Sequence, residues 1–133
     1  IYRNHKDIGA VVHSHSKWAS ILSCMRINIP AFHYMVAEFG GSDIKCSKYA
    51  TFGSEQLSKY VNKVLHNRKG CLIANHGQVT FADTLEEAID LSIALEKLSE
   101  QYYFLIISRK AKLLSDKEMC KIVKLFKDYK VKH

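Results

Sequence analysis

The stretch Gly9-Ala-Val-Val-His-Ser-His15 decides how this sequence is interpreted. Valine is β-branched and favours extended backbone, and a glycine often precedes a strand, so these residues predict a β-strand. Side chains two residues apart in a strand point to the same face, which brings the imidazoles of His13 and His15 side by side. The pair suits two ligands of one metal ion, although two surface histidines at a strand edge have the same spacing.

A third histidine, His76, is the candidate that completes such a metal site. It lies between two hydrophobic segments, Cys71-Leu-Ile-Ala-Asn75 and Gln78–Ala82, which predict two short strands. Gly77 is expected to give this tight junction its backbone freedom. Three histidines without a nearby thiolate form an open, catalytic type of zinc site. A turn residue held by hydrogen bonds remains the alternative for His76.

Helix and strand patterns are mixed along the chain, with no internal repeat and no linker. Apolar residues at helical spacing follow several residues that commonly cap helices. Residues 31–35 are expected to be extended. The pattern predicts a single α/β domain with a partly antiparallel sheet. The expected helices begin near Ser16, Ser54, Thr84 and Ser115.

The net charge of +7 in 133 residues is unevenly distributed. Residues 109–133 contain nine basic and three acidic residues, net +6, whereas residues 1–108 contain eleven basic and ten acidic residues, net +1. Lys117 and Lys121 recur at helical spacing opposite Ile122 and Phe126, as in a packed helix with a solvated lysine face. This interpretation is favoured over nucleic-acid binding, which stays an alternative. No apolar run is long enough to span a membrane.

Four cysteines are present, and none forms a C-x-x-C pair. They are expected to be small core residues in a reducing compartment, which predicts a cytoplasmic protein. The chain begins with Ile1 and shows no signal peptide, so a fragment or a processed chain is expected. The cysteines are Cys24, Cys46, Cys71 and Cys120.

Further motifs follow the H-x-H strand in order: Ile29-Pro-Ala-Phe-His-Tyr-Met35, Tyr49-Ala-Thr-Phe-Gly-Ser54, Asn75-His-Gly77 and Thr84-Leu-Glu-Glu-Ala88. Together they resemble the zinc-dependent class II aldolase/adducin family over essentially all of residues 1–133. Within that family, the chain is most similar to members that act on L-fuculose 1-phosphate. The resemblance implies a three-layer α/β/α domain with a mixed, largely antiparallel central sheet.

The resemblance also implies roles for individual side chains. Tyr34 matches a catalytic tyrosine that reaches into the neighbouring subunit's active site, where it stabilises or protonates the developing alkoxide. Phe52 matches a residue of the aldehyde pocket. Phe126 and Tyr129 match an aromatic pair that closes over the substrate pocket, although both could be ordinary core contacts of a helix. The implied zinc ligands are His13, His15 and His76.

The implied activity is the reversible, Zn²⁺-dependent cleavage of L-fuculose 1-phosphate to dihydroxyacetone phosphate and L-lactaldehyde, a step of fucose degradation. A homotetramer with active sites at its subunit interfaces is expected, with no nucleic acid or membrane partner. The alternatives are a related sugar-phosphate enzyme, such as a pentulose-phosphate 4-epimerase or a dehydratase, and a non-catalytic adducin-like module.

One departure from the family pattern concerns the catalytic glutamate and the phosphate-binding residues. In the family they precede the H-x-H strand, and this chain begins too late to contain them. Glu38 and Glu55 do not match the glutamate motif. Residues 1–133 are therefore expected to be the C-terminal portion of the family domain, incomplete as an enzyme by itself.

Overall fold

The chain was analysed as a computed structural model, which describes residues 1–5 and 8–131 but not the side chains of residues 130 and 131. Within the described residues, no helix is both long and apolar enough to cross a membrane. The elements follow in the order β1 (Ala10–Ser14), α1 (Lys17–Met25), the 3₁₀ helix η1 (Tyr34–Phe39), α2 (Glu55–Val64), β2 (Gly70–Ile73), β3 (Gly77–Ala82), α3 (Leu85–Ser108) and α4 (Asp116–Val131).

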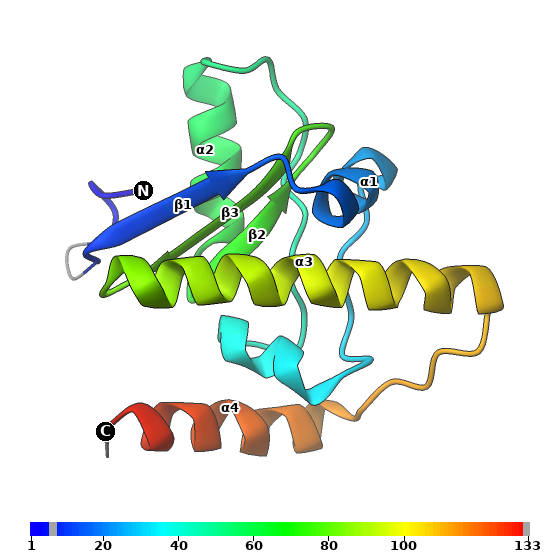
Figure 1. Cartoon of the computed structure of the whole chain (residues 1–133). Helices are drawn as coiled ribbons and strands as arrows, with labels where there is room; N and C mark the ends of the chain where they lie inside the picture. The colour runs from blue at the N-terminus through cyan, green and yellow to red at the C-terminus, as the bar shows by residue number, and fades with distance from the viewer. Residues whose placement is uncertain (6–7, 132–133) are drawn as a thin grey trace.

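A three-stranded sheet in the order β1-β3-β2 forms the centre of the fold, and both strand pairs are antiparallel. His13 lies opposite Val79, and Cys71 lies opposite the same residue from the other side. One parallel bridge, from Cys46 to Leu72, adds a mixed element. In Figure 1, α2 lies behind the sheet, and the long helix α3 crosses in front of it. The predicted α/β/α layering and largely antiparallel sheet are confirmed.

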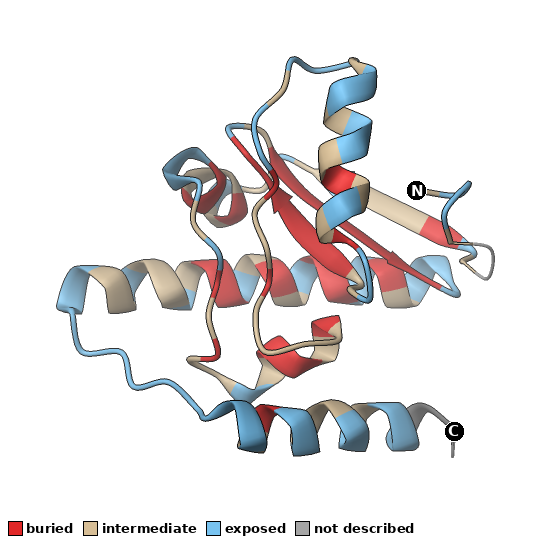
Figure 2. Ribbon diagram, turned by 180° about the vertical axis from the view of Figure 1, so that it is seen from behind, coloured by how far each residue is buried: buried red, intermediate tan, exposed pale blue. Residues whose placement is uncertain are grey.

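Alternate side chains of each strand supply two separate cores, one on each face of the sheet. On one face, Val61 of α2 and the C-cap residue Leu65 pack against Cys71, Val79 and Phe81. The other face packs against α1 and α3 in a larger core that continues through η1 to α4. Figure 2 shows the sheet largely buried, whereas α4 exposes most of its surface. Helix α4, which lies within the basic segment 109–133, is thus an outer layer.

Three of the four predicted helix starts have the expected side-chain cap. In each, the backbone N–H of the residue three positions later donates to the side-chain oxygen of the cap residue. The cap residues are Ser54, Thr84 and Ser115. The expectation of extended backbone for residues 31–35 is wrong at its end, because η1 begins at Tyr34. The N–H of Met35 donates to Nδ1 of His33, which caps η1. This local hydrogen bond favours the 3₁₀ turn over an extended backbone.

The expectation that all four cysteines are core residues is also wrong. Cys71 is buried and Cys46 is half-buried, but Cys24 and Cys120 are exposed on α1 and α4. All four thiols are free. Burial raises the pKa of Cys46 to about 11, so this thiol is unreactive near neutral pH. The two helices are amphipathic, and each places its cysteine on the solvent side.

Candidate metal centre

The three predicted histidines converge at one end of the sheet. One ring nitrogen from each of His13, His15 and His76 can be chosen so that all three atoms lie within 4.8 Å of one another. The Nε2 atoms of His13 and His15 are 3.1 Å apart, close to the spacing of about 3.3 Å expected for two nitrogens on one tetrahedral zinc ion. Residues 61 positions apart in sequence thereby form one cluster, which confirms that the histidines come together.

The backbone of β3 fixes the orientation of the first histidine. Nδ1 of His13 lies 2.7 Å from the carbonyl oxygen of Gln78, so this nitrogen carries the proton and donates it. The Nε2 lone pair then faces the cluster. A metal-binding histidine commonly donates its second ring N–H in this way, which sets the tautomer and the ring plane.

Backbone hydrogen bonds hold the turn that carries His76. Its N–H lies 3.0 Å from the carbonyl of Ile73 and 3.2 Å from Oγ of Ser23. The N–H of Ala74 donates to Oγ of Ser47 at 3.3 Å. His76 is therefore both a turn residue and a member of the cluster, so the two interpretations of its position are compatible.

The expectation that Gly77 supplies backbone freedom is wrong. Glycine is needed at this position because β1 approaches the backbone closely. Its φ is not in the left-handed region; Asn75 takes that role with φ 54°. A Cβ atom on Gly77 would lie 2.4 Å from the carbonyl oxygen of Ser14 and 3.2 Å from Cδ2 of His15. A side chain here would push β1 away from β3 and separate His15 from His76.

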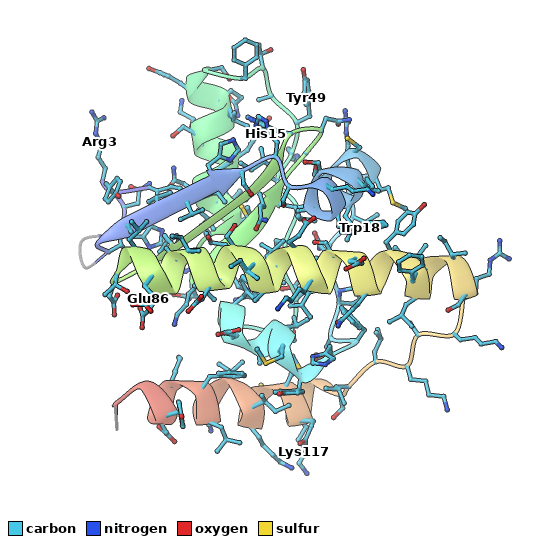
Figure 3. The ribbon with its side chains drawn as sticks, viewed as in Figure 1. Arg3, His15, Trp18, Tyr49, Glu86 and Lys117 are labelled. Carbon is cyan, nitrogen blue, oxygen red and sulfur yellow. The ribbon has the colours of Figure 1, made fainter. Side chains whose placement is uncertain are left out.

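An open cavity of about 630 Å³ borders the histidines. Phe52 and Tyr49 line it together with the three imidazoles. Figure 3 shows Tyr49 near His15, at the end of the molecule above β1. Phe52 is 82 % exposed, which is unusual for a large apolar ring and leaves it available to a ligand. The predicted pocket residue Phe52 thus lies beside the predicted ligands.

Helix α1, which follows His15 directly, is capped from another element. Ser16 occupies the N-cap position but its side chain does not cap, which corrects the sequence expectation. Instead, the carboxylate of Glu96 on α3 accepts from the N–H groups of Trp18 and Ala19 and from Oγ of Ser16, at 2.7–2.8 Å. A carboxylate at a helix N-terminus is stabilised by the helix dipole and by these donors.

The remaining predicted site residues lie elsewhere in the chain. Tyr34, on η1, is 52 % exposed and stacks on His33. Phe126 and Tyr129 of α4 line a different cavity, of about 770 Å³, together with Glu38 of η1. Figure 1 shows η1 (cyan) and α4 on the far side of α3 from the end of β1 that leads to His15. Within one chain, the structure does not bring these residues to the histidines.

Several supporting residues were not found by sequence reasoning. Gln78, Ser23 and Glu96 contact the histidine segments from β3, α1 and α3. Their polar contacts join elements far apart in sequence, and no local pattern marks such pairs. Tyr49 was also missed, but the sequence offered a way to find it, because it begins the motif that contains Phe52.

The protonation of His76 suits a metal ion. Burial, and then the nearby His13 and His15, lowers the pKa of His76. Neutral imidazole is the form that binds a metal. Three imidazoles beside an open cavity leave room for a further ligand, as catalytic zinc sites require. The donor set and its spacing therefore fit a zinc ion.

Known proteins share this fold and sequence. Residues 1–103 match the model of the class II aldolase and adducin N-terminal domain. The chain is 41% identical to a 5-methylthioribulose-1-phosphate/5-deoxyribulose-1-phosphate aldolase of Rhodospirillum rubrum, over 97% of this chain and 58% of that protein. It is 39% identical to an L-fuculose phosphate aldolase of Escherichia coli, over 96% of this chain and 60% of that protein.

A solved structure agrees with these matches. An L-fuculose 1-phosphate aldolase superposes with a TM-score of 0.89 at 32% identity, over 95% of this chain and 59% of that one. The chain thus spans about three fifths of the length of these relatives. The matched family model covers most of the chain, including all three histidines. The chain belongs to the class II aldolase and adducin family.

Proposed function

We propose that the whole protein is a zinc-dependent aldolase that reversibly cleaves a ketose 1-phosphate to dihydroxyacetone phosphate and an aldehyde. The convergence of His13, His15 and His76 beside an open cavity carries this proposal. An adducin-like module that only binds partners has no need for three converging metal-binding nitrogens. The two relatives named above are aldolases, which supports the same reaction class.

The residues of this chain would hold the metal and shape the pocket. His13, fixed by the carbonyl of Gln78, offers Nε2 together with the nitrogens of the other two histidines. A bound zinc ion supplies Lewis-acid stabilisation for the negative charge that develops as the carbon–carbon bond breaks. Phe52 and Tyr49 would contact the aldehyde part of the substrate across the cavity.

Among the residues that the structure describes, no carboxylate that could act as the general base lines the cavity. Glu38 and Glu55 do not line it. We propose that the family glutamate and the phosphate-binding residues come from a part of the protein outside this sequence. Tyr34, Phe126 and Tyr129 would serve the cavity of a neighbouring copy in a homotetramer, because they lie far from the histidines of their own chain.

Separate observations favour three ketose 1-phosphates as substrates. L-Fuculose 1-phosphate, which would give L-lactaldehyde, is supported by the 39% identical relative and by the superposed structure. 5-Methylthioribulose or 5-deoxyribulose 1-phosphate is supported by the 41% identical relative. The exposed Phe52 fits an apolar methyl or methylthio end in either case.

The test is an assay of the protein with its natural flanking sequence against these three ketose 1-phosphates. Release of dihydroxyacetone phosphate is measured before and after chelation and after zinc is restored. We expect cleavage of at least one substrate, loss on chelation and recovery with zinc. A folded protein that binds no zinc, or that epimerises a pentulose phosphate without cleaving it, would overturn the proposal.

A cytoplasmic location remains a prediction.

A further inference from the structure

The C-terminal end of α1 and the turn that carries His76 share one backbone acceptor. The carbonyl of Ser23 accepts from the N–H of Arg26 at 3.1 Å and from the N–H of Asn75 at 3.0 Å. Oγ of the same serine accepts from the N–H of His76 at 3.2 Å. The last turn of the helix and the histidine turn are therefore joined directly.

A side-chain contact strengthens this junction. Nε of Arg26 donates to Oδ1 of Asn75 at 2.7 Å, and the guanidinium carbon lies 5.3 Å from the ring centre of Tyr49. Arg26 therefore touches the residue immediately before His76 and a wall of the metal-site cavity. A charge-assisted hydrogen bond of this length is among the stronger polar contacts in proteins.

The backbone at both ends of this contact is left-handed. Arg26 has φ 52° as the C-cap of α1, and Asn75 has φ 54°. Glycine is the residue that best suits a left-handed helix C-cap, and a residue with a Cβ is strained there. Asparagine tolerates this region better than arginine does. The strained position holds the Arg26 side chain where it can reach Asn75.

We propose that Arg26 is a positioning residue of the metal centre, acting through Asn75 on the third histidine. This inference rests on the proposed function, because it assumes that the histidines bind zinc. Helix α1 begins two residues after His15 and ends beside the turn of His76, so it sets the distance between two ligands. Without the Arg26 contact, the turn would be held by its backbone bonds and by the hydroxyls of Ser23 and Ser47, and His76 would sample more positions.

The discriminating variant is Arg26→Gly. Glycine suits the left-handed C-cap, so the metal-free chain should be as stable as the wild type or more stable. Zinc affinity should nevertheless fall by about tenfold, the lower range for loss of a group that orients a ligand. The measurements are thermal unfolding of the metal-free chain and competition for Zn²⁺ with a chromophoric chelator.

The chain contains a matched control. Arg109 is the C-cap of α3 with φ 53°, and Figure 3 shows the C-terminal end of α3 far from His15. Arg109→Gly should change the stability in the same direction as Arg26→Gly and leave zinc affinity unchanged. An equal loss of affinity in both variants would show a general effect of helix ends and would overturn the proposal.

A second variant tests the path through Asn75. Asn75→Gly keeps the left-handed backbone and removes the acceptor, and the double variant with Arg26→Gly should lose no more zinc affinity than the weaker-binding single variant. The absorption spectrum of bound Co²⁺ should change in the same way in both single variants. Additive losses, or an Arg26→Gly chain with wild-type affinity, overturn this inference alone. A wild-type chain that binds no zinc overturns the proposed function as well.

Discussion

The histidine end of the sheet and the η1–α4 side of the molecule hold the predicted site residues in two very different ways. At the histidine end, short polar contacts from β3, α1 and α3 fix the functional segments. On the η1–α4 side, Tyr34 lies on an exposed surface, and α4 packs its apolar face on η1. Figure 3 shows His15 and Lys117, at the start of α4, on opposite sides of the molecule.

This difference teaches how much of a site one chain can build. Metal ligands must meet within a few ångströms, and here the groups that orient their segments come from the same chain. The aromatic residues of the η1–α4 side do not line the metal-site cavity of their own chain. They can reach a metal-site cavity only if that cavity belongs to a second copy, which is the arrangement proposed for Tyr34.

The largest expected effect is at the histidine end. His76→Ala leaves two nitrogens of the cluster, and zinc affinity should fall more than about 100-fold because a ligand itself is lost. The metal content of the purified chain and a chelator competition measure this. His66→Ala is the control, since His66 is exposed beyond α2 and should leave zinc binding intact. Retention of zinc by His76→Ala would remove it as the third ligand.

The next effect tests whether the two regions meet between copies. In the protein with its natural flanking sequence, Tyr34→Phe should lower kcat by about 100-fold, because a proton donor is lost, and should leave zinc affinity unchanged. Mixed oligomers of Tyr34→Phe and His76→Ala copies should regain about a quarter of wild-type activity, since some interfaces then contain both intact residues. Mixtures that exchange subunits and stay inactive would contradict the shared site.

The smallest effect compares one substitution in both regions. Glu96→Gln should destabilise the chain by about 2 kcal/mol, because the carboxylate that accepts from three donors at the N-terminus of α1 loses its charge and one acceptor. Glu118→Gln on α4 alters a pair with Lys121 that is exposed on both sides and should cost about 0.5 kcal/mol or less. Urea unfolding measures the loss in free energy of unfolding for each variant. Equal losses would contradict the view that the polar contacts of the histidine end are the more important for stability.

Particular residues show how far the sequence could be used. The β-branched run within Gly9–His15 predicted the strand that the structure shows at Ala10–Ser14. The two-residue period of a strand predicted that His13 and His15 share a face. The caps at Thr84 and Ser115 were predicted, since they depend on residues three positions apart. Ser16 was predicted as an N-cap from its residue type and occupies that position, but its side chain does not cap the helix. A carboxylate 80 positions away in sequence takes the place of its hydroxyl.

The sequence by itself determined the strands, most helices, the three histidines and the family resemblance, because these depend on local spacing and residue type. Only the tertiary structure decided which residues surround the histidines. Gly77 permits the approach of β1, Gln78 orients His13, and Arg26 reaches Asn75. Each of these contacts joins segments that are distant in sequence, and its geometry exists only after the sheet has formed and α1 has packed against it.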